Sequence, residues 1–251
     1  MKKTLLAVTL AALTSGAATT ALAADPKAPA PDFEISGNFG LFSDYRFRGI
    51  SQTDRKAALQ GGFDFTHKSG FYVGNWNSNI SSSFTAGANV ENDIYAGIVK
   101  EVGPVELNLG VLRYIYPGAT ATAKPDTTEV YLGVTYGPIS YKYSHSTTNY
   151  FGANSGNSKG SSYQEINASF DLTDSISVSA HAGRTNIAKT STGDFSDYRI
   201  GLSYALPDDY SIGLTYFTNS GLSSNEKETS FTNLGRKLYD NAAVISLSKT
   251  F

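Results

Sequence analysis

The chain has 251 residues, of which 40% are apolar and only 17% are charged, and its formal net charge is −2. The absence of cysteine excludes a disulfide scaffold, a cysteine-ligated metal site and a cysteine nucleophile. The near-neutral charge excludes a generally basic nucleic-acid binder. Beyond position 23, no run of about 20 apolar residues could form a membrane-spanning helix. A composition with 24 glycines and 16 tyrosines favours a β protein.

The first 23 residues have the pattern of a secretory signal peptide. Two lysines precede an apolar run over residues 5–13, and an A-x-A cleavage site ends at Ala23. We therefore predict export into the bacterial envelope and a mature chain that starts at Ala24, with a retained helical anchor as the alternative. Residues 24–32 contain three prolines and predict an extended lead-in segment.

From Phe33 onward, apolar and polar residues alternate with the period of two that indicates β-strands. Between Val130 and Tyr136, for example, every second residue is apolar. We predict twelve strands, over about residues 33–48, 57–67, 71–80, 91–100, 105–116, 127–136, 139–149, 163–172, 176–187, 196–206, 210–219 and 240–251.

The connectors between these strands alternate in length. Short connectors follow the even strands, at residues 68–70, 101–104, 137–138, 173–175 and 207–209. Longer polar connectors follow the odd strands, at residues 49–56, 81–90, 117–126, 150–162, 188–195 and 220–239. Transmembrane β-barrels combine short periplasmic turns with long outer loops. We therefore predict an all-β fold over residues 33–251, a transmembrane antiparallel up-and-down β-barrel of about 12 strands. A soluble barrel is the alternative.

The last predicted strand closes the barrel and ends in Phe251, with Ala243, Ile245 and Leu247 sharing one face. This ending is similar to the C-terminal signature that the barrel-assembly machinery reads on outer-membrane proteins. Phe251 is accordingly predicted to be an assembly signal. The expected partners are that machinery, outer-membrane lipid and lipopolysaccharide. Lys249 interrupts the alternation and is expected to snorkel to the periplasmic interface.

Three motifs are more specific than the composition. They are SDYRFRGISQT at residues 43–53, GFYVGNW at residues 70–76 and YIYPG at residues 114–118. With these motifs the chain resembles the TorF-type porins, a family of bacterial outer-membrane proteins, over most of its mature length. The resemblance implies an outer-membrane barrel of porin type. It implies no particular substrate and no catalytic residues.

The in–out alternation predicts which charged side chains line the interior. Asp44, Arg46 and Arg48 are expected on the inward face of the first strand, near the first outer loop. There an arginine pair would favour anions, while ion pairs that brace the wall are the alternative role. The further candidate pore-lining residues are Asp64, Glu129, Glu165, Asp197 and Arg199.

Strand number limits the pore. Eight strands leave an interior that side chains fill and 16 to 18 leave an aqueous channel, so about twelve predict a narrow one. We predict a porin-like channel for passive diffusion of small hydrophilic solutes or ions. A non-conducting structural or adhesive barrel is the alternative. An outer-membrane phospholipase has less support, because His67, His145 and His181 form no pattern with a serine. We expect no enzyme activity, no cofactor, no metal and no nucleic-acid partner.

Overall fold

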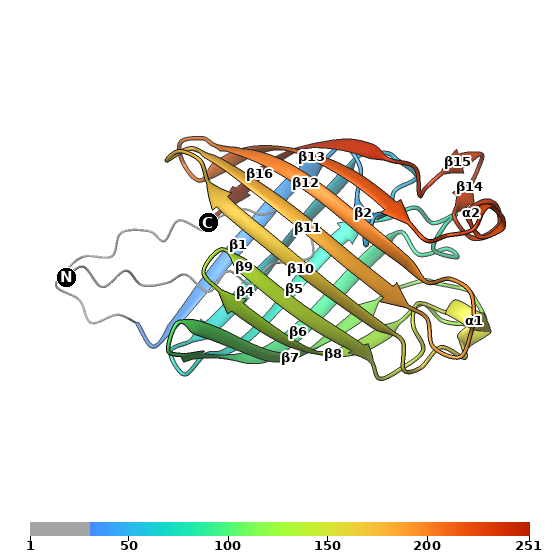
Figure 1. The fold of residues 1–251 in the computed structure, drawn as a ribbon, viewed down its shortest axis with the longest axis horizontal. Helices are drawn as coiled ribbons and strands as arrows, with labels where there is room; N and C mark the ends of the chain where they lie inside the picture. The colour runs from blue at the N-terminus through green and yellow to red at the C-terminus, as the bar shows by residue number, and fades with distance from the viewer. Residues whose placement is uncertain (1–30) are drawn as a thin grey trace.

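The computed structural model describes residues 31–251, and within these residues twelve antiparallel strands close into a barrel (Figure 1). The first strand pairs with the second barrel strand on one side and with the last on the other. The predicted closed barrel, including its closure by the C-terminal strand, is thus confirmed. The predicted signal peptide and nearly all of the lead-in segment lie outside the described residues.

The barrel strands agree with the predicted ones to within a few residues, except for the first. The sequence predicts a first strand to residue 48, whereas β1 ends at Phe42. The barrel strands are β1 (Phe33–Phe42), β4 (Ala58–His67), β5 (Phe71–Asn79), β6 (Val90–Val102), β7 (Val105–Ile115), β8 (Thr127–Tyr136), β9 (Ile139–Ser146), β10 (Ser162–Asp171), β11 (Ile176–Asn186), β12 (Phe195–Ala205), β13 (Tyr210–Ser220) and β16 (Ala242–Thr250).

The two ends of the barrel differ as the connector lengths predict. One end has tight turns, such as Gly137–Pro138, where Gly137 takes a φ of 56° that other residues rarely adopt. The C-terminus lies at this end (Figure 1). The other end carries the small elements of the long loops, which are β2 (Arg46–Phe47), β3 (Ile50–Ser51), α1 (Ala153–Gly156), α2 (Ser224–Ser230), β14 (Thr232–Asn233) and β15 (Arg236–Lys237). Within residues 31–251, no helix is both long enough and apolar enough to cross a membrane.

The outer face of the barrel is apolar. Leu132, Ile200 and Leu214 are each at least half exposed, and exposed apolar residues of the same kind lie on every barrel strand except β11, whose Ile176 and Val178 are half-buried. Soluble monomers rarely expose apolar patches larger than a few hundred Å². A belt that surrounds the whole barrel is therefore the surface expected to face lipid rather than water.

Inward tyrosines lie against glycines on the neighbouring strands. A Cβ atom at any of these glycines would collide with the tyrosine ring, so only glycine admits the ring against the wall. The pairs are Tyr72 with Gly97, Tyr95 with Gly74, Tyr131 with Gly110, and Tyr163 with Gly183. This packing accounts for part of the unusual glycine and tyrosine content.

The barrel closes where β1 meets β16. Beyond the last residue of β16, Gly37 and Phe251 exchange two backbone hydrogen bonds of 2.6 and 2.9 Å. The Phe251 ring lies on the outer face beside Gly37 and meets the Phe63 ring edge-on, with centroids 6.1 Å apart. Lys249 points outward and donates a hydrogen bond of 2.7 Å to the Asp208 carbonyl in the adjacent tight turn, as snorkelling predicts.

Candidate functional site in the barrel interior

The segment between β1 and β4 folds into the barrel instead of extending its wall. We call residues 43–57 the arm, and all of residues 44–54 are buried. At its tip, β2 and β3 form a hairpin that turns at Arg48 and Gly49. Both turn residues have positive φ, 47° and 79°, as in the hairpin turns that match the twist of paired strands.

The arm corrects the predicted positions of Asp44, Arg46 and Arg48. All three lie inside the barrel, but on the arm and not on the wall of the first strand. The period-two pattern continues past Phe42 because the hairpin is also extended. Its apolar residues pack inside the barrel instead of facing lipid. Alternation alone does not separate these two cases.

Arg48 crosses the interior and joins the arm to β8. Its Nη2 donates to both carboxylate oxygens of Glu129, at 2.8 and 3.1 Å, and its Nη1 donates to the Tyr150 hydroxyl at 2.7 Å. The guanidinium also lies 4.0 Å from the centre of the Tyr163 ring. Burial is the largest single influence and lowers the pKa of Arg48, but the Glu129 carboxylate together with the Tyr150 and Tyr114 hydroxyls outweighs it, so the net pKa is raised. Arg48 therefore anchors the arm to β8, and the Glu129 carboxylate neutralises its charge.

Arg46 forms hydrogen bonds within the arm and to the loop between β13 and β16. Its Nε donates to Asp44 at 2.8 Å, and its Nη1 donates to the backbone carbonyls of Gly49 and Asp240 at 3.0 and 2.6 Å. Asp44 also accepts a hydrogen bond of 2.6 Å from the Ser51 hydroxyl. The remaining Nη2 of Arg46 is buried and has no hydrogen-bond partner among residues 31–251.

Aromatic rings fill the space between the arm and strands β5 to β8. Tyr45 meets Trp76 edge-on at 5.3 Å, and Phe47 meets Tyr114 at 5.6 Å. Phe151, from the loop that carries α1, packs on Tyr114 at 4.9 Å. This side of the interior is a packed core.

Strands β9 to β12 carry a polar network on the other side. Lys142 Nζ lies 2.7 Å from Glu165, and His181 Nε2 lies 2.9 Å from Asp197 Oδ1. His181 Nδ1 lies 2.7 Å from the side-chain oxygen of Asn167. The carboxylates of this network are thus already engaged by protein groups.

Arg199 is the exception in the network. It is the next inward residue after Asp197 on β12, and no carboxylate of residues 31–251 lies within 4 Å of it. Its recorded hydrogen bond is a long one of 3.4 Å from Nη2 to the side-chain oxygen of Asn167. Its guanidinium charge is therefore not neutralised by direct contact.

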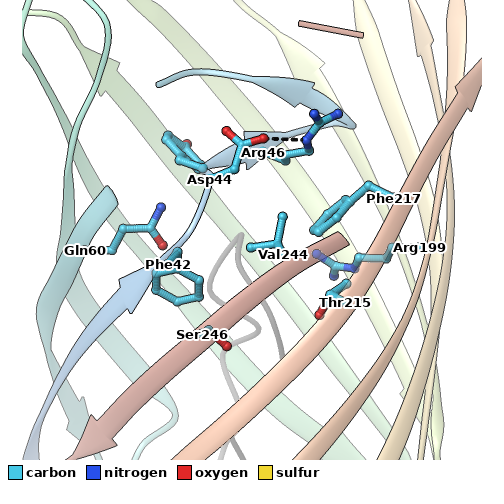
Figure 2. A pocket seen from close by; sticks show the side chains of 10 residues that line it. Phe42, Asp44, Arg46, Gln60, Arg199, Thr215, Phe217, Val244 and Ser246 are labelled. Atoms are coloured by element: carbon cyan, nitrogen blue, oxygen red, sulfur yellow. Dashed lines mark hydrogen bonds and ion pairs between the residues drawn. The ribbon is translucent and has the colours of Figure 1, made fainter. Parts of the chain in front are cut away.

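Two cavities lie between the arm and this polar wall. The first, of about 20 Å³, is drawn in Figure 2, and the second is about 30 Å³. Arg46, Arg199 and Phe217 line both cavities. A single water molecule needs about 10–15 Å³. These two cavities together thus have room for only a few water-sized molecules.

The predicted wall residues all lie on inward positions, but the structure does not bring them together. Glu165, Asp197 and Arg199 line the second cavity. Glu129 lies behind the arm and binds Arg48, while Asp64 accepts a hydrogen bond of 2.6 Å from Tyr95. Neither of these two residues lines the two cavities.

Sequence reasoning missed one member of the site. From the sequence, His181 is only a histidine without a catalytic pattern, whereas the structure places it between two carboxylates at the second cavity. Its inward parity on β11, with Ser177, Ser179 and Thr185, was readable from the sequence. The two cavities can hold small polar molecules, and the described residues contain no group of three metal-ligating side chains.

The family described as "Bacterial protein of unknown function (Gcw_chp)" matches residues 24–251. The chain belongs to this family. The fold of this Gcw_chp protein is similar to the solved KdgM porin, with a TM-score of 0.54 and 7% identity over 86% of this chain and 98% of that one. A solved NanC porin gives a TM-score of 0.51 and 9% identity over 87% and 99% of the two chains. At such low identity the likeness establishes the fold alone. No curated protein matches the chain in sequence.

Proposed function

We propose that the protein is an outer-membrane channel of porin type, through which small hydrophilic solutes or ions diffuse passively. The observation that carries the proposal is a closed barrel with an apolar outer belt and charged side chains around cavities in its interior. A barrel that only braced the membrane would have no need for the unneutralised Arg199. Fixed charges in a narrow lumen select which solutes pass.

The arm makes this channel narrow. Cavities of about 20 and 30 Å³ admit water or small ions, and a larger solute requires the arm to shift. The Arg48–Glu129 pair holds the arm in place, so this pair sets how much of the lumen is open. We therefore expect small conductance steps from the wild-type protein.

Export, assembly and family identity are finer parts of the same proposal. We propose that residues 1–23 are removed as a signal peptide and that the chain is a TorF-type porin. The position of Phe251, at the point where the sheet closes, supports its role as the signal for the assembly machinery. A KdgM structure similar in fold, with a TM-score of 0.52 and 8% identity, is described as a complex with disordered oligogalacturonate. We do not extend that solute to this chain, because its cavities are too small for a sugar chain.

Conductance in a planar bilayer tests the proposal. Purified wild-type protein, shown to be assembled by its heat-dependent migration, should give discrete current steps. Arg48→Ala should give larger steps, because the arm is released from β8. If assembled wild-type and Arg48→Ala proteins both gave no current, a structural or adhesive barrel would replace the channel.

Labelling on intact cells tests the location. The chain has no cysteine, so Lys159→Cys in a long loop introduces a single reactive site. An impermeant thiol reagent should label it on intact cells. Asp174→Cys, in a tight turn, is the matched control and should react only after the outer membrane is broken. The reverse result would invert the topology.

A further inference from the structure

We propose that Arg46 and Arg199 together form a binding site for a small monovalent anion, a halide ion or a single carboxylate group, where the two interior cavities adjoin. The site deepens the proposed channel function, on which its consequence for transport rests. Binding itself is a separate property and is tested separately below.

Arg46 supplies a donor that the protein leaves unused. Its side chain is fully buried, and three of its hydrogen bonds go to Asp44, Gly49 and Asp240. The Nη2 group has none among residues 31–251, although it is buried, and Arg46 lines both cavities. A buried donor without a partner is destabilising, so an acceptor in the cavity would be held there.

Arg199 supplies the charge. It lies on the wall across from the arm, and Figure 2 shows the two arginines on either side of Phe217 in this view. The long bond to Asn167 leaves most of its guanidinium donors free. A guanidinium group presents planar paired donors, which suit a carboxylate as well as a halide ion.

The other charges around the cavities favour a monovalent anion over a cation. Each carboxylate that lines them already has a protein partner, as Asp44 has Arg46 and Glu165 has Lys142. Asp197 contacts His181 and the Tyr163 hydroxyl. The cations Arg48 and Lys142 are likewise paired with acids. Within residues 31–251, Arg199 is the one of these cations with no carboxylate in direct contact, so a monovalent anion in the cavity can approach its guanidinium directly.

The size of the cavities limits the ligand further. At about 20 and 30 Å³, the two cavities hold a few water-sized groups. A halide ion or a carboxylate head fits this volume, whereas a phosphorylated sugar does not. The apolar Phe217 ring beside the site excludes part of the competing water, which strengthens the attraction between the ion and the arginines.

Bromide diffraction tests the binding site directly. Crystals of the full mature barrel grown in sodium bromide should show anomalous density between Arg46 and Arg199. Arg199→Gln should lose that density, and Arg199→Lys should keep part of it. Arg113→Gln is the matched control, because Arg113 points outward and pairs with Asp126. Wild-type crystals without bromide at this place would overturn the proposal.

Selectivity in a bilayer tests the consequence for transport. Arg199→Gln should lower the anion-to-cation permeability ratio about fivefold, the factor for one charge at about 4 Å in water. Arg113→Gln should leave the ratio unchanged. Conductance with an unchanged ratio in Arg199→Gln would overturn the anion site while the channel stands. Bromide bound in a protein without conductance would refute the channel while the site stands.

Discussion

Between the arm and strands β5 to β8 the interior is filled by aromatic rings, whereas between the arm and strands β9 to β13 it is lined by charged side chains and keeps two cavities. Both halves come from strands with the same alternation. The first half uses tyrosines that lie on glycines and receives the apolar face of the arm. The second receives Arg46, while Arg48 reaches Glu129 on β8 and also borders the second cavity. The comparison teaches that the arm divides one barrel into a packed side and a side that keeps charged cavities.

Among the substitutions that test this comparison, Arg48→Ala should have the largest effect, because it removes the contact that holds the arm between the two halves. The substitution leaves the Glu129 carboxylate buried without its partner, and such a loss costs about 3–5 kcal/mol. The temperature at which the folded barrel converts to the slower-migrating form should fall markedly. The double variant Arg48→Met with Glu129→Gln removes both charges and should regain most of the loss. Equal losses in the single and double variants would count against the pair as the anchor.

Leu132 and Gly133 test the in–out register on which both halves rest. Leu132 is 50% exposed on the outer face, and Gly133 faces inward. Leu132→Arg should destabilise the barrel by about 2–4 kcal/mol, because an arginine at the middle of the bilayer is costly. Gly133→Ser should cost far less. Denaturant unfolding in lipid vesicles measures both, and the opposite order would show that the register is wrong.

Gly110 tests whether the packing of tyrosine rings on glycines stabilises the packed half. A Cβ there would meet the Tyr131 ring and lie 2.8 Å from the Ala96 carbonyl oxygen. Gly110→Ala should therefore cost about 1–3 kcal/mol by overpacking. Gly133→Ala is the matched control, because its Cβ would lie at an ordinary 3.4 Å from Asn108. If both alanines were tolerated equally in unfolding experiments, the tyrosine packing would contribute no stability.

The smallest effect is expected from a single hydroxyl in the packed half. Tyr131→Phe removes the hydrogen bond between Tyr131 and Tyr72 and should cost about 0.5–1.5 kcal/mol. Conductance and selectivity should not change, because the ring stays in place on the packed side. A clear change in selectivity would mean that ions pass along this half as well.

Much of the barrel could be predicted from the sequence because alternation and connector length are local signals. Leu132 and Gly133 show this, since their opposite orientations follow from their parity. The arm could not be predicted, because Tyr45 and Phe47 alternate with charged residues whether they face lipid or the interior. Arg48 and Glu129 are 81 residues apart, and neither residue type indicates the other as a partner. The division of the lumen depends on such long-range contacts.

The meeting of β1 and β16 has a consequence for how the chain is made. β1 is near the beginning of the chain, and its last partner residue is Phe251, the final one. Until β16 and Phe251 pair with it, β1 presents a row of unpaired backbone groups along one edge. Such an open edge is a template for pairing with other chains. A chain in which the seam between β1 and β16 is still open is therefore prone to pair with other chains, and closure of that seam removes the edge.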